Sequence, residues 1–130
     1  MSFKTINLKT IGDERGSLIA LENNAEIPFD VKRVYYIFNT QDQVSRGFHA
    51  HINLKQMAIC VAGSCKFILD DGVSRSEVLL SKPDEALYIE GLIWREMHDF
   101  SEDCVLLVLA SQVYDEADYI RNYSEFKRLV

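Results

Sequence analysis

Short runs of β-branched, aromatic and aliphatic residues, separated at short intervals by turn-forming residues, constrain the fold of this chain more than any other sequence feature. Gly12–Gly16 separates two such runs, and Asp70–Gly72 supplies residues that tolerate a positive φ between two others. This pattern is typical of β-sandwiches and β-barrels. The sequence therefore predicts an all-β fold with a hairpin at each of these two points.

Later segments refine this prediction. Side chains alternate in size and polarity over Gln56–Val61 and Cys65–Leu69, as they do in half-buried antiparallel strands. The run Cys104–Ala110 is apolar throughout, which predicts a strand that is covered on both faces and central in its sheet.

Beyond Tyr114 the spacing of apolar and aromatic side chains lengthens to three or four residues. The side chains with this spacing are Tyr119, Tyr123, Phe126 and Val130. Asp115 and Glu116 precede them, and acidic residues favour the start of a helix. The sequence thus predicts a C-terminal helix that packs on the barrel.

Length and charge limit the classes of function. The 130 residues, about half of them hydrophobic, suit one domain over residues 1–130. A net charge of -6 disfavours nucleic acid as a partner, because gripping a phosphate backbone requires many basic residues. The chain shows no signal-peptide run and no segment long enough to span a bilayer, so we expect a soluble, cytoplasmic protein without a membrane partner.

The three cysteines, Cys60, Cys65 and Cys104, lie among apolar or strand-like neighbours. They form neither a CxxC motif nor a cysteine–histidine spacing typical of metal sites. Because free cysteine is among the most buried residue types, we interpret all three as core thiols.

His49 and His51 are two residues apart, so on an extended strand both imidazoles point to the same side and can meet one ligand. The alternative is a pair of exposed surface histidines. Gln56 and Gly63 follow at spacings that resemble the first cupin motif, in which HxH and a downstream glutamate face into a small barrel. Here Gln56 stands in place of that glutamate.

A metal site would require further lone-pair donors. Where the second cupin motif has a histidine, this chain has Arg95, which donates no lone pair and repels a divalent cation. His98 lies an odd number of residues from Arg95, so on a strand it faces the other way. We therefore expect no metal, and we predict that the two imidazoles transfer protons near neutral pH in an isomerisation or epimerisation.

Arginines and tyrosines are the other candidates for ligand contacts. Guanidinium groups bind phosphate oxygens through paired hydrogen bonds, which suggests an anionic substrate. The candidates are Arg15, Arg33, Arg46 and Arg95, each of which also suits a solvated surface position. Tyr35 and Tyr36 are adjacent on a predicted strand, so only one of them can face the barrel interior.

Five strings agree in order and spacing with one family, and together they extend over essentially the whole chain. They are Asp13-Glu14-Arg15-Gly16-Ser17-Leu18, Lys32-Arg33-Val34-Tyr35-Tyr36-Ile37, Arg46-Gly47-Phe48-His49-Ala50-His51, Trp94-Arg95-Glu96-Met97 and Val108-Leu109-Ala110-Ser111. They closely resemble the dTDP-sugar 3,4-ketoisomerases, a WxcM-like or FdtA/QdtA-type cupin family. The resemblance implies a jelly-roll homodimer that converts dTDP-4-keto-6-deoxy-D-glucose into a dTDP-3-keto-6-deoxyhexose for amino-sugar synthesis in surface glycans, without a metal or organic cofactor.

The resemblance also implies roles for individual residues. By motif match, His49 and His51 remove the C3 proton of the sugar and return one at C4 through an enediol or enediolate, with either histidine as the base. Five further residues are expected to contact the diphosphate or the sugar, or to support these contacts as polar neighbours. They are Arg15, Arg33, Tyr35, Arg46 and Gln56. The configuration of the product at C4 is left open, because Arg15 is typical of the galacto branch whereas members that make the gluco product can carry arginine at the position of Arg95.

Three other functions compete with this hypothesis. A nucleotide-sugar 3,5-epimerase inverts a carbon instead of moving the ketone, so product analysis separates the two enzymes. A metal-dependent cupin oxygenase contains stoichiometric iron or nickel. A cupin that binds a sugar without converting it leaves the C3 hydrogen of the keto sugar unexchanged in deuterated water.

Overall fold

The computed structural model describes residues 2–130 and confirms the all-β prediction. Its strands are β1 (Phe3–Asn7), β2 (Ile11–Asp13), β3 (Gly16–Leu18), β4 (Arg33–Ile37), β5 (Arg46–His51), β6 (Gln56–Ala62), β7 (Cys65–Asp70), β8 (Arg75–Leu80), β9 (Glu85–Ile89), β10 (Trp94–His98), β11 (Val105–Ala110) and β12 (Tyr119–Ile120). A 3-10 helix spans Glu116–Asp118, and the helix α1 spans Tyr123–Leu129.

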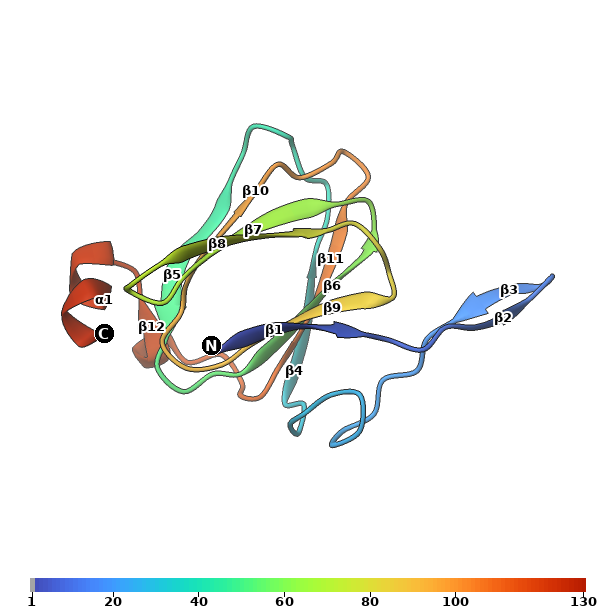
Figure 1. The fold of residues 1–130 in the computed structure, drawn as a ribbon, viewed down its shortest axis with the longest axis horizontal. Coiled ribbons are helices and arrows are strands. Elements are labelled where there is room, and N and C mark those ends of the chain that lie inside the picture. Colours follow the sequence, from blue (N-terminus) through green and yellow to red (C-terminus); the bar gives the residue numbers. More distant parts are fainter. Residues whose placement is uncertain (1) are drawn as a thin grey trace.

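Two five-stranded antiparallel sheets enclose the barrel (Figure 1). One sheet has the strand order β1-β9-β6-β11-β4, and the other has the order β12-β5-β10-β7-β8. From β4 onward the chain passes repeatedly from one sheet to the other, as it does in a jelly roll. The prediction of a small jelly-roll barrel with a C-terminal helix is therefore confirmed.

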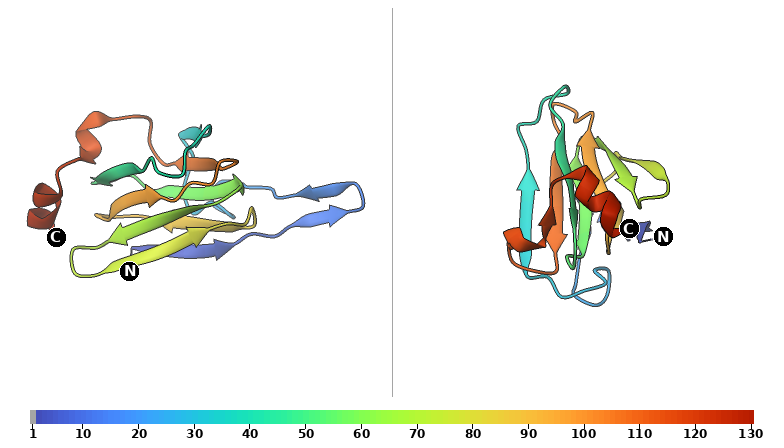
Figure 2. Two further views of the ribbon diagram at one scale, coloured as in Figure 1. Left: turned by 90° about the horizontal axis from the view of Figure 1, so that it is seen from above. Right: turned by 90° about the vertical axis from the view of Figure 1, so that its left-hand side faces the viewer.

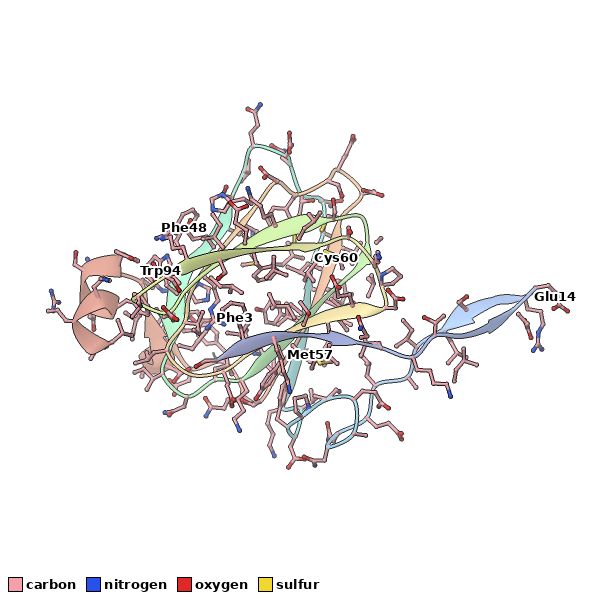
Figure 3. All side chains as sticks on the ribbon, viewed as in Figure 1. Phe3, Glu14, Phe48, Met57, Cys60 and Trp94 are labelled. Atoms are coloured by element: carbon pink, nitrogen blue, oxygen red, sulfur yellow. The ribbon has the colours of Figure 1, made fainter. Side chains whose placement is uncertain are left out.

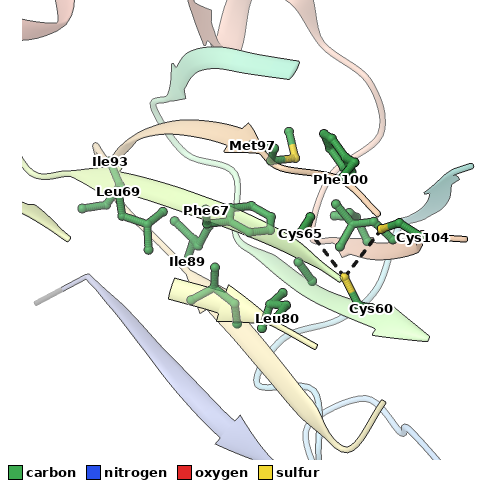
Figure 4. Close-up of a cluster of buried hydrophobic side chains, with 14 residues drawn as sticks. Cys60, Cys65, Phe67, Leu69, Leu80, Ile89, Ile93, Met97, Phe100 and Cys104 are labelled. Atoms are coloured by element: carbon green, nitrogen blue, oxygen red, sulfur yellow. Dashed lines mark hydrogen bonds between the residues drawn. The ribbon is translucent and has the colours of Figure 1, made fainter. Parts of the chain in front are cut away.

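The main hydrophobic core fills the space between these sheets (Figure 4). Phe67 and Leu69 enter it from one sheet, and Leu87 and Leu106 enter it from the other. All four side chains are buried, and burying a side chain of this kind stabilises a fold by about 1.5–3 kcal/mol.

β6 differs from the half-buried strand that its alternating side chains predict. Ala58 and Cys60 face the main core, whereas Met57 and Ile59 pack in a second cluster on the other side. That cluster exists because the segment between β3 and β4, which includes Phe29, covers the outer face of the sheet. β6 is consequently buried on both faces, so the half-buried prediction was wrong for this strand.

One further local prediction is confirmed and another holds in part. β11 lies between β6 and the edge strand β4, so it is an interior strand as its apolar run predicts, but the central strand of the sheet is β6. Asp70–Gly72 opens the turn from β7 to β8, where Asp70 pairs with Arg75 and Gly72 has a φ of 95°.

The hairpin predicted at Gly12–Gly16 is also confirmed, and it extends away from the barrel at the end opposite α1 (Figures 1 and 2). Within residues 2–130, β2 and β3 pair only with each other. Glu14 lies at the far tip (Figure 3). Ile11 and Leu18 are opposite each other in the register, and they are 52% and 57% exposed. We call the segment Ile11–Leu18 the arm.

The C-terminal helix is shorter than its side-chain period predicts. Asp115 caps the 3-10 helix, Asn122 caps α1, and Tyr119 lies between them on β12. β12 pairs with the edge of β5, so sheet hydrogen bonds override the helical spacing at Tyr119. Among residues 2–130, no helix combines the length and apolar character that crossing a membrane requires.

Candidate active site

A bulge in β5 places His49 and His51 inside the barrel. The pairing of β5 with β10 shifts register between Arg95 and Glu96, where Gly47 has a φ of 91°. A Cβ atom at Gly47 would lie 3.0 Å from the Arg95 carbonyl oxygen, so this close approach favours glycine. Beyond the bulge the two imidazole rings lie 4.8 Å apart between centroids, at an angle of 86°. The predicted convergence of the two histidines is confirmed.

A buried carboxylate orients His51. Asp118 Oδ2 lies 3.2 Å from His51 Nδ1 and also accepts the Leu54 backbone N–H, while Oδ1 accepts the Asn53 backbone N–H at 2.8 Å. An ionised carboxylate only accepts hydrogen bonds, so Nδ1 carries the imidazole proton and Nε2 keeps its lone pair. Asp118 therefore holds His51 in the tautomer that can act as a base through Nε2.

One nitrogen of each imidazole is available to a ligand. His49 Nδ1 and His51 Nε2 are buried and have no hydrogen-bond partner among residues 2–130. Leaving a buried polar atom unpaired costs about 1–3 kcal/mol, so the fold retains these atoms at a cost that a bound molecule can offset. The Tyr119 ring packs against both imidazoles, with centroid distances of 5.1 Å to His49 and 4.3 Å to His51. This geometry suits proton transfer to and from one substrate.

Arg95 places a buried positive charge behind the histidines. Its Nη1 donates to Gln56 Oε1 at 2.6 Å, and its Nη2 donates to the Ile93 carbonyl oxygen at 2.9 Å. Gln56 Nε2 in turn donates to Tyr35 Oη at 3.1 Å. Because Tyr35 Oη accepts this hydrogen bond, its own hydroxyl proton remains available to a ligand.

Burial and the charge of Arg95 favour neutral imidazoles. Together, in that order of importance, they lower the pKa of His49 to about 4 and the pKa of His51 to about 2. The contact of His51 with Asp118 is thus a hydrogen bond from a neutral ring and not an ion pair. Burial lowers the pKa of Arg95 only to about 10, so the guanidinium stays charged at neutral pH. Both histidines can therefore accept a proton there.

A pocket of about 500 Å³ opens over His49. This volume lies within the range of small-molecule sites. Arg33, Arg46 and Arg121 line it, together with Tyr35 and Tyr119. Three guanidinium groups around one pocket make it suitable for an anionic ligand such as a diphosphate.

The structure brings together seven of the eight site residues predicted from the sequence. Four line the pocket: Arg33, Tyr35, Arg46 and His49. Three are buried behind it: His51, Gln56 and Arg95. Arg15 is the exception, because it lies in the arm, paired with Asp13, with its side chain 85% exposed. Within one chain, Arg15 therefore does not line this pocket.

Two orientation predictions are confirmed. Tyr35 faces the interior and bonds to Gln56, whereas Tyr36 points outward and is 62% exposed. His98 lies on the opposite side of β10 from Arg95, where its two nitrogens bond to Ser45 and Glu96.

Three site residues were missed by the sequence analysis: Asp118, Tyr119 and Arg121. Tyr119 pairs with His51 across β12 and β5, which brings its ring onto the histidines. Arg121 donates two hydrogen bonds to Glu116 and lies 4.2 Å above the Tyr119 ring. The run of acidic, aromatic and basic residues after Tyr114 was the available signal, but it also fits an amphipathic helix.

The donor set beside the two histidines does not fit the divalent metal of a typical cupin. The Gln56 amide oxygen already accepts a hydrogen bond from Arg95. The guanidinium has no lone pair for a metal, and its fixed charge repels a divalent cation. The chemistry of these side chains thus favours acid–base catalysis over metal catalysis.

Replacing Arg95 tests the origin of the lowered histidine pKa values. Arg95→Met removes the buried charge, so we expect the pKa of His49 and the pKa of His51 to rise, while burial keeps both below 6.5. NMR titration of the imidazole signals measures this rise. Because the base must be neutral, the acid limb of kcat/KM should move to higher pH in the same variant.

Arg95→Lys is the matched variant, because it retains a cation but loses the guanidinium fork. It should keep both histidine pKa values low. Equal titration curves for wild type and Arg95→Met would show that the charge of Arg95 has no influence on these imidazoles.

The family described as FdtA: WxcM-like, C-terminal matches residues 1–130. A TDP-4-oxo-6-deoxy-alpha-D-glucose-3,4-oxoisomerase of Aneurinibacillus thermoaerophilus is 55% identical over 130 residues, which cover 100% of this chain and 94% of that relative.

Solved structures agree with this similarity. QdtA, a 3,4-ketoisomerase of Thermoanaerobacterium thermosaccharolyticum, was solved as a histidine-to-asparagine variant with TDP-4-keto-6-deoxyglucose; it is 45% identical, with a TM-score of 0.96, over 98% of this chain and 93% of that one. The WlaRB TDP-quinovose 3,4-ketoisomerase of Campylobacter jejuni is 56% identical, with a TM-score of 0.94, over 97% of each chain. Full-length matches at these identities, on a jelly roll with the expected histidine pair, lead to one conclusion: this chain belongs to the FdtA, WxcM-like family of sugar 3,4-ketoisomerases.

Proposed function

We propose that this chain is an isomerase that moves the keto group of dTDP-4-keto-6-deoxy-D-glucose from C4 to C3. The observation that carries this proposal is the pair of unpartnered nitrogens, His49 Nδ1 and His51 Nε2, buried beside an arginine-lined pocket. A relative that is 45% identical was solved with the same substrate. The product is a dTDP-3-keto-6-deoxyhexose of galacto or gluco configuration, a precursor for deoxyamino sugars of surface glycans.

The reaction requires two proton transfers at neighbouring carbons. A base removes the C3 proton, which the C4 ketone makes acidic, and an enediolate forms. Protonation at C4, with transfer of the hydroxyl proton from O3 to O4, restores a ketone at C3. No atom is gained or lost, so the reaction needs no external oxidant. His49 and His51 perform the two carbon proton transfers between them, because each has one buried ring nitrogen that makes no hydrogen bond within residues 2–130.

Fixed charges and donors support the enediolate and the nucleotide. Arg95 lies behind the histidines and supplies positive charge where negative charge develops on the sugar oxygens. Tyr35 directs its hydroxyl proton toward the pocket. Arg33 and Arg46 bind the diphosphate, and Gln56 holds Arg95 and Tyr35 in place.

We propose that the chain acts as a homodimer in which the arm reaches the partner subunit. Apolar side chains remain exposed on the arm and on the neighbouring sheet face, including Leu18, Val34 and Tyr36. Exposed apolar surface of this kind marks interaction sites. The arm also explains the position of Arg15, which cannot serve its own pocket but can serve a partner's pocket.

Mixing two inactive variants tests this arrangement. If Arg15 acts across the dimer, His49→Asn and Arg15→Ala are each defective at every site, but a mixed dimer contains one site with both native residues. We therefore expect activity to appear when the two variants are unfolded together and refolded as a mixture. If sedimentation shows mixed dimers but the mixture remains as inactive as its components, Arg15 does not act in the pocket of the partner subunit.

We further propose that residues 1–130 form one catalytic domain and that the protein works in the cytoplasm. Two strands of one sheet and three of the other contribute site residues, so the site needs the whole barrel. Cys60, Cys65 and Cys104 are free thiols, as is usual in a reducing compartment.

Product analysis with substrate labelled with ¹³C at C4 tests the activity. Ketone migration converts the labelled carbonyl carbon into a carbon bearing a hydroxyl group, which moves its NMR signal out of the carbonyl region. A 3,5-epimerase leaves the label as a carbonyl, and a sugar-binding protein leaves the whole spectrum unchanged. Loss of turnover after treatment with a chelator, with recovery on adding a metal, would contradict acid–base catalysis without a metal.

A further inference from the structure

All three cysteines of the chain meet at one point in the main core (Figure 4). They come from different strands or strand ends: Cys60 from β6, Cys65 from the start of β7, and Cys104 from the residue before β11. Cys60 Sγ lies 3.6 Å from Cys65 Sγ and 3.8 Å from Cys104 Sγ, and all three sulfur atoms lie within 4.8 Å of one another. All three residues are buried.

These separations match those of sulfur ligands around one small ion. A zinc–thiolate bond is about 2.3 Å long, so sulfurs around such an ion in tetrahedral or trigonal geometry lie about 3.8–4.0 Å apart. The distances from Cys60 Sγ to its two neighbours are within a few tenths of an ångström of this range. Small side-chain rotations would suffice to complete a trigonal site.

The surroundings select the class of ion. Thiol and thiolate sulfur are soft ligands that favour Cu(I) and Zn²⁺. Structural Zn²⁺ is almost always four-coordinate, and the cluster packs against apolar side chains such as Phe67, Phe100 and Leu80 instead of a fourth donor. No fourth histidine, cysteine or carboxylate completes this group among residues 2–130. A three-coordinate soft monovalent ion fits this environment better.

We propose that Cys60, Cys65 and Cys104 form a binding site for one Cu(I) ion. In this step Cu(I) enters, copper–sulfur bonds form to all three cysteines, and the three thiol protons leave to solvent; no atom is oxidised or reduced. The site is separate from the catalytic pocket, because Gln56 and Cys60 lie toward opposite ends of β6.

Anaerobic titration of the reduced full chain with Cu(I), against the coloured chelator bathocuproine disulfonate, tests the proposal. We expect one equivalent of Cu(I) to be withdrawn from the chelator. X-ray absorption of the copper-loaded protein should show three sulfur neighbours at about 2.3 Å. Copper that stays with the chelator, or copper coordinated by nitrogen, would overturn the proposal.

Variants separate this site from the histidine pair. Cys60→Ala should weaken Cu(I) binding at least about 100-fold, the upper range for losing even a supporting residue of a metal site. The double variant His49→Asn/His51→Asn should bind Cu(I) as wild type does, and a loss of binding there would place the ion at the histidines and overturn the proposal. If Cys60→Ala fails to fold, as judged by circular dichroism, the sulfur count in the wild-type absorption spectrum still decides the question.

Discussion

Replacing either histidine of the pair by asparagine is expected to lower kcat by at least about 100-fold, the lower range for a positioned general acid or base. Asparagine matches the size of imidazole approximately but cannot accept and return a proton near neutral pH. His49 Nδ1 and His51 Nε2 make no hydrogen bond within residues 2–130, so the loss should appear in turnover rather than in folding. Steady-state kinetics with dTDP-4-keto-6-deoxy-D-glucose, together with circular dichroism, measure both properties.

His98→Asn is the matched control, because His98 lies on the opposite side of β10 and bonds to Ser45 and Glu96. Its kcat should remain that of wild type. If both pocket variants turned over substrate at the wild-type rate, the assignment of the histidines to proton transfer would be wrong.

Replacing Asp118 by asparagine is expected to give the second largest decrease in kcat. Asp118 accepts the Nδ1 proton of His51, and an asparagine amide can instead donate to Nδ1 and reverse the tautomer. Nε2 then carries the proton and cannot act as a base. A buried carboxylate that fixes a catalytic histidine is worth up to about 10⁴-fold in a serine protease, so we expect kcat to fall at least about 100-fold.

A variant of a neighbouring residue distinguishes this effect from misfolding. Asp118→Asn keeps an acceptor oxygen for the backbone N–H of Asn53 but places its amide group where Oδ2 accepts the backbone N–H of Leu54, so circular dichroism should accompany the kinetics to verify the fold. Asp115→Asn alters a carboxylate in the same segment that only caps the 3-10 helix, and it should retain wild-type kcat. A similar loss in both variants would indicate that the segment is merely structural.

The all-β fold and the pairing of His49 with His51 could be predicted from the sequence. Both depend on how side chains alternate between the two faces of a single strand. Residues two apart on a strand share a face, which correctly placed His49 beside His51. The same rule separated Tyr35 from Tyr36. The uninterrupted apolar run of β11 correctly predicted an interior strand, although β6 and not β11 is central in that sheet.

The remaining site residues depend on long-range pairing that local spacing does not encode. Asp118 and Tyr119 lie more than sixty residues from the histidines in sequence. They come close to the histidines because β12 pairs with β5 in the folded sheet. A helical spacing and a short edge strand are compatible with the same residues, and tertiary pairing decides between them. The convergence of the three cysteines is hidden for the same reason, since each lies on a different part of the barrel.

Arg15 illustrates a different limit. Its motif placed it with the substrate, but its own chain carries it out on the arm, away from the pocket. In the proposed homodimer Arg15 serves the partner's pocket, an arrangement that the geometry of one chain does not contain.

The proposed 3,4-ketoisomerase reaction is tested most directly by proton NMR in deuterated water, with dTDP-4-keto-6-deoxy-D-glucose and either wild type or His51→Asn. We expect wild type to move the ketone to C3 and to place solvent deuterium at C4, with a single configuration that identifies the galacto or gluco product, and the variant to leave most of the substrate unconverted. A wild-type spectrum that keeps the ketone at C4, with or without inversion at another carbon, would contradict the assignment as a 3,4-ketoisomerase.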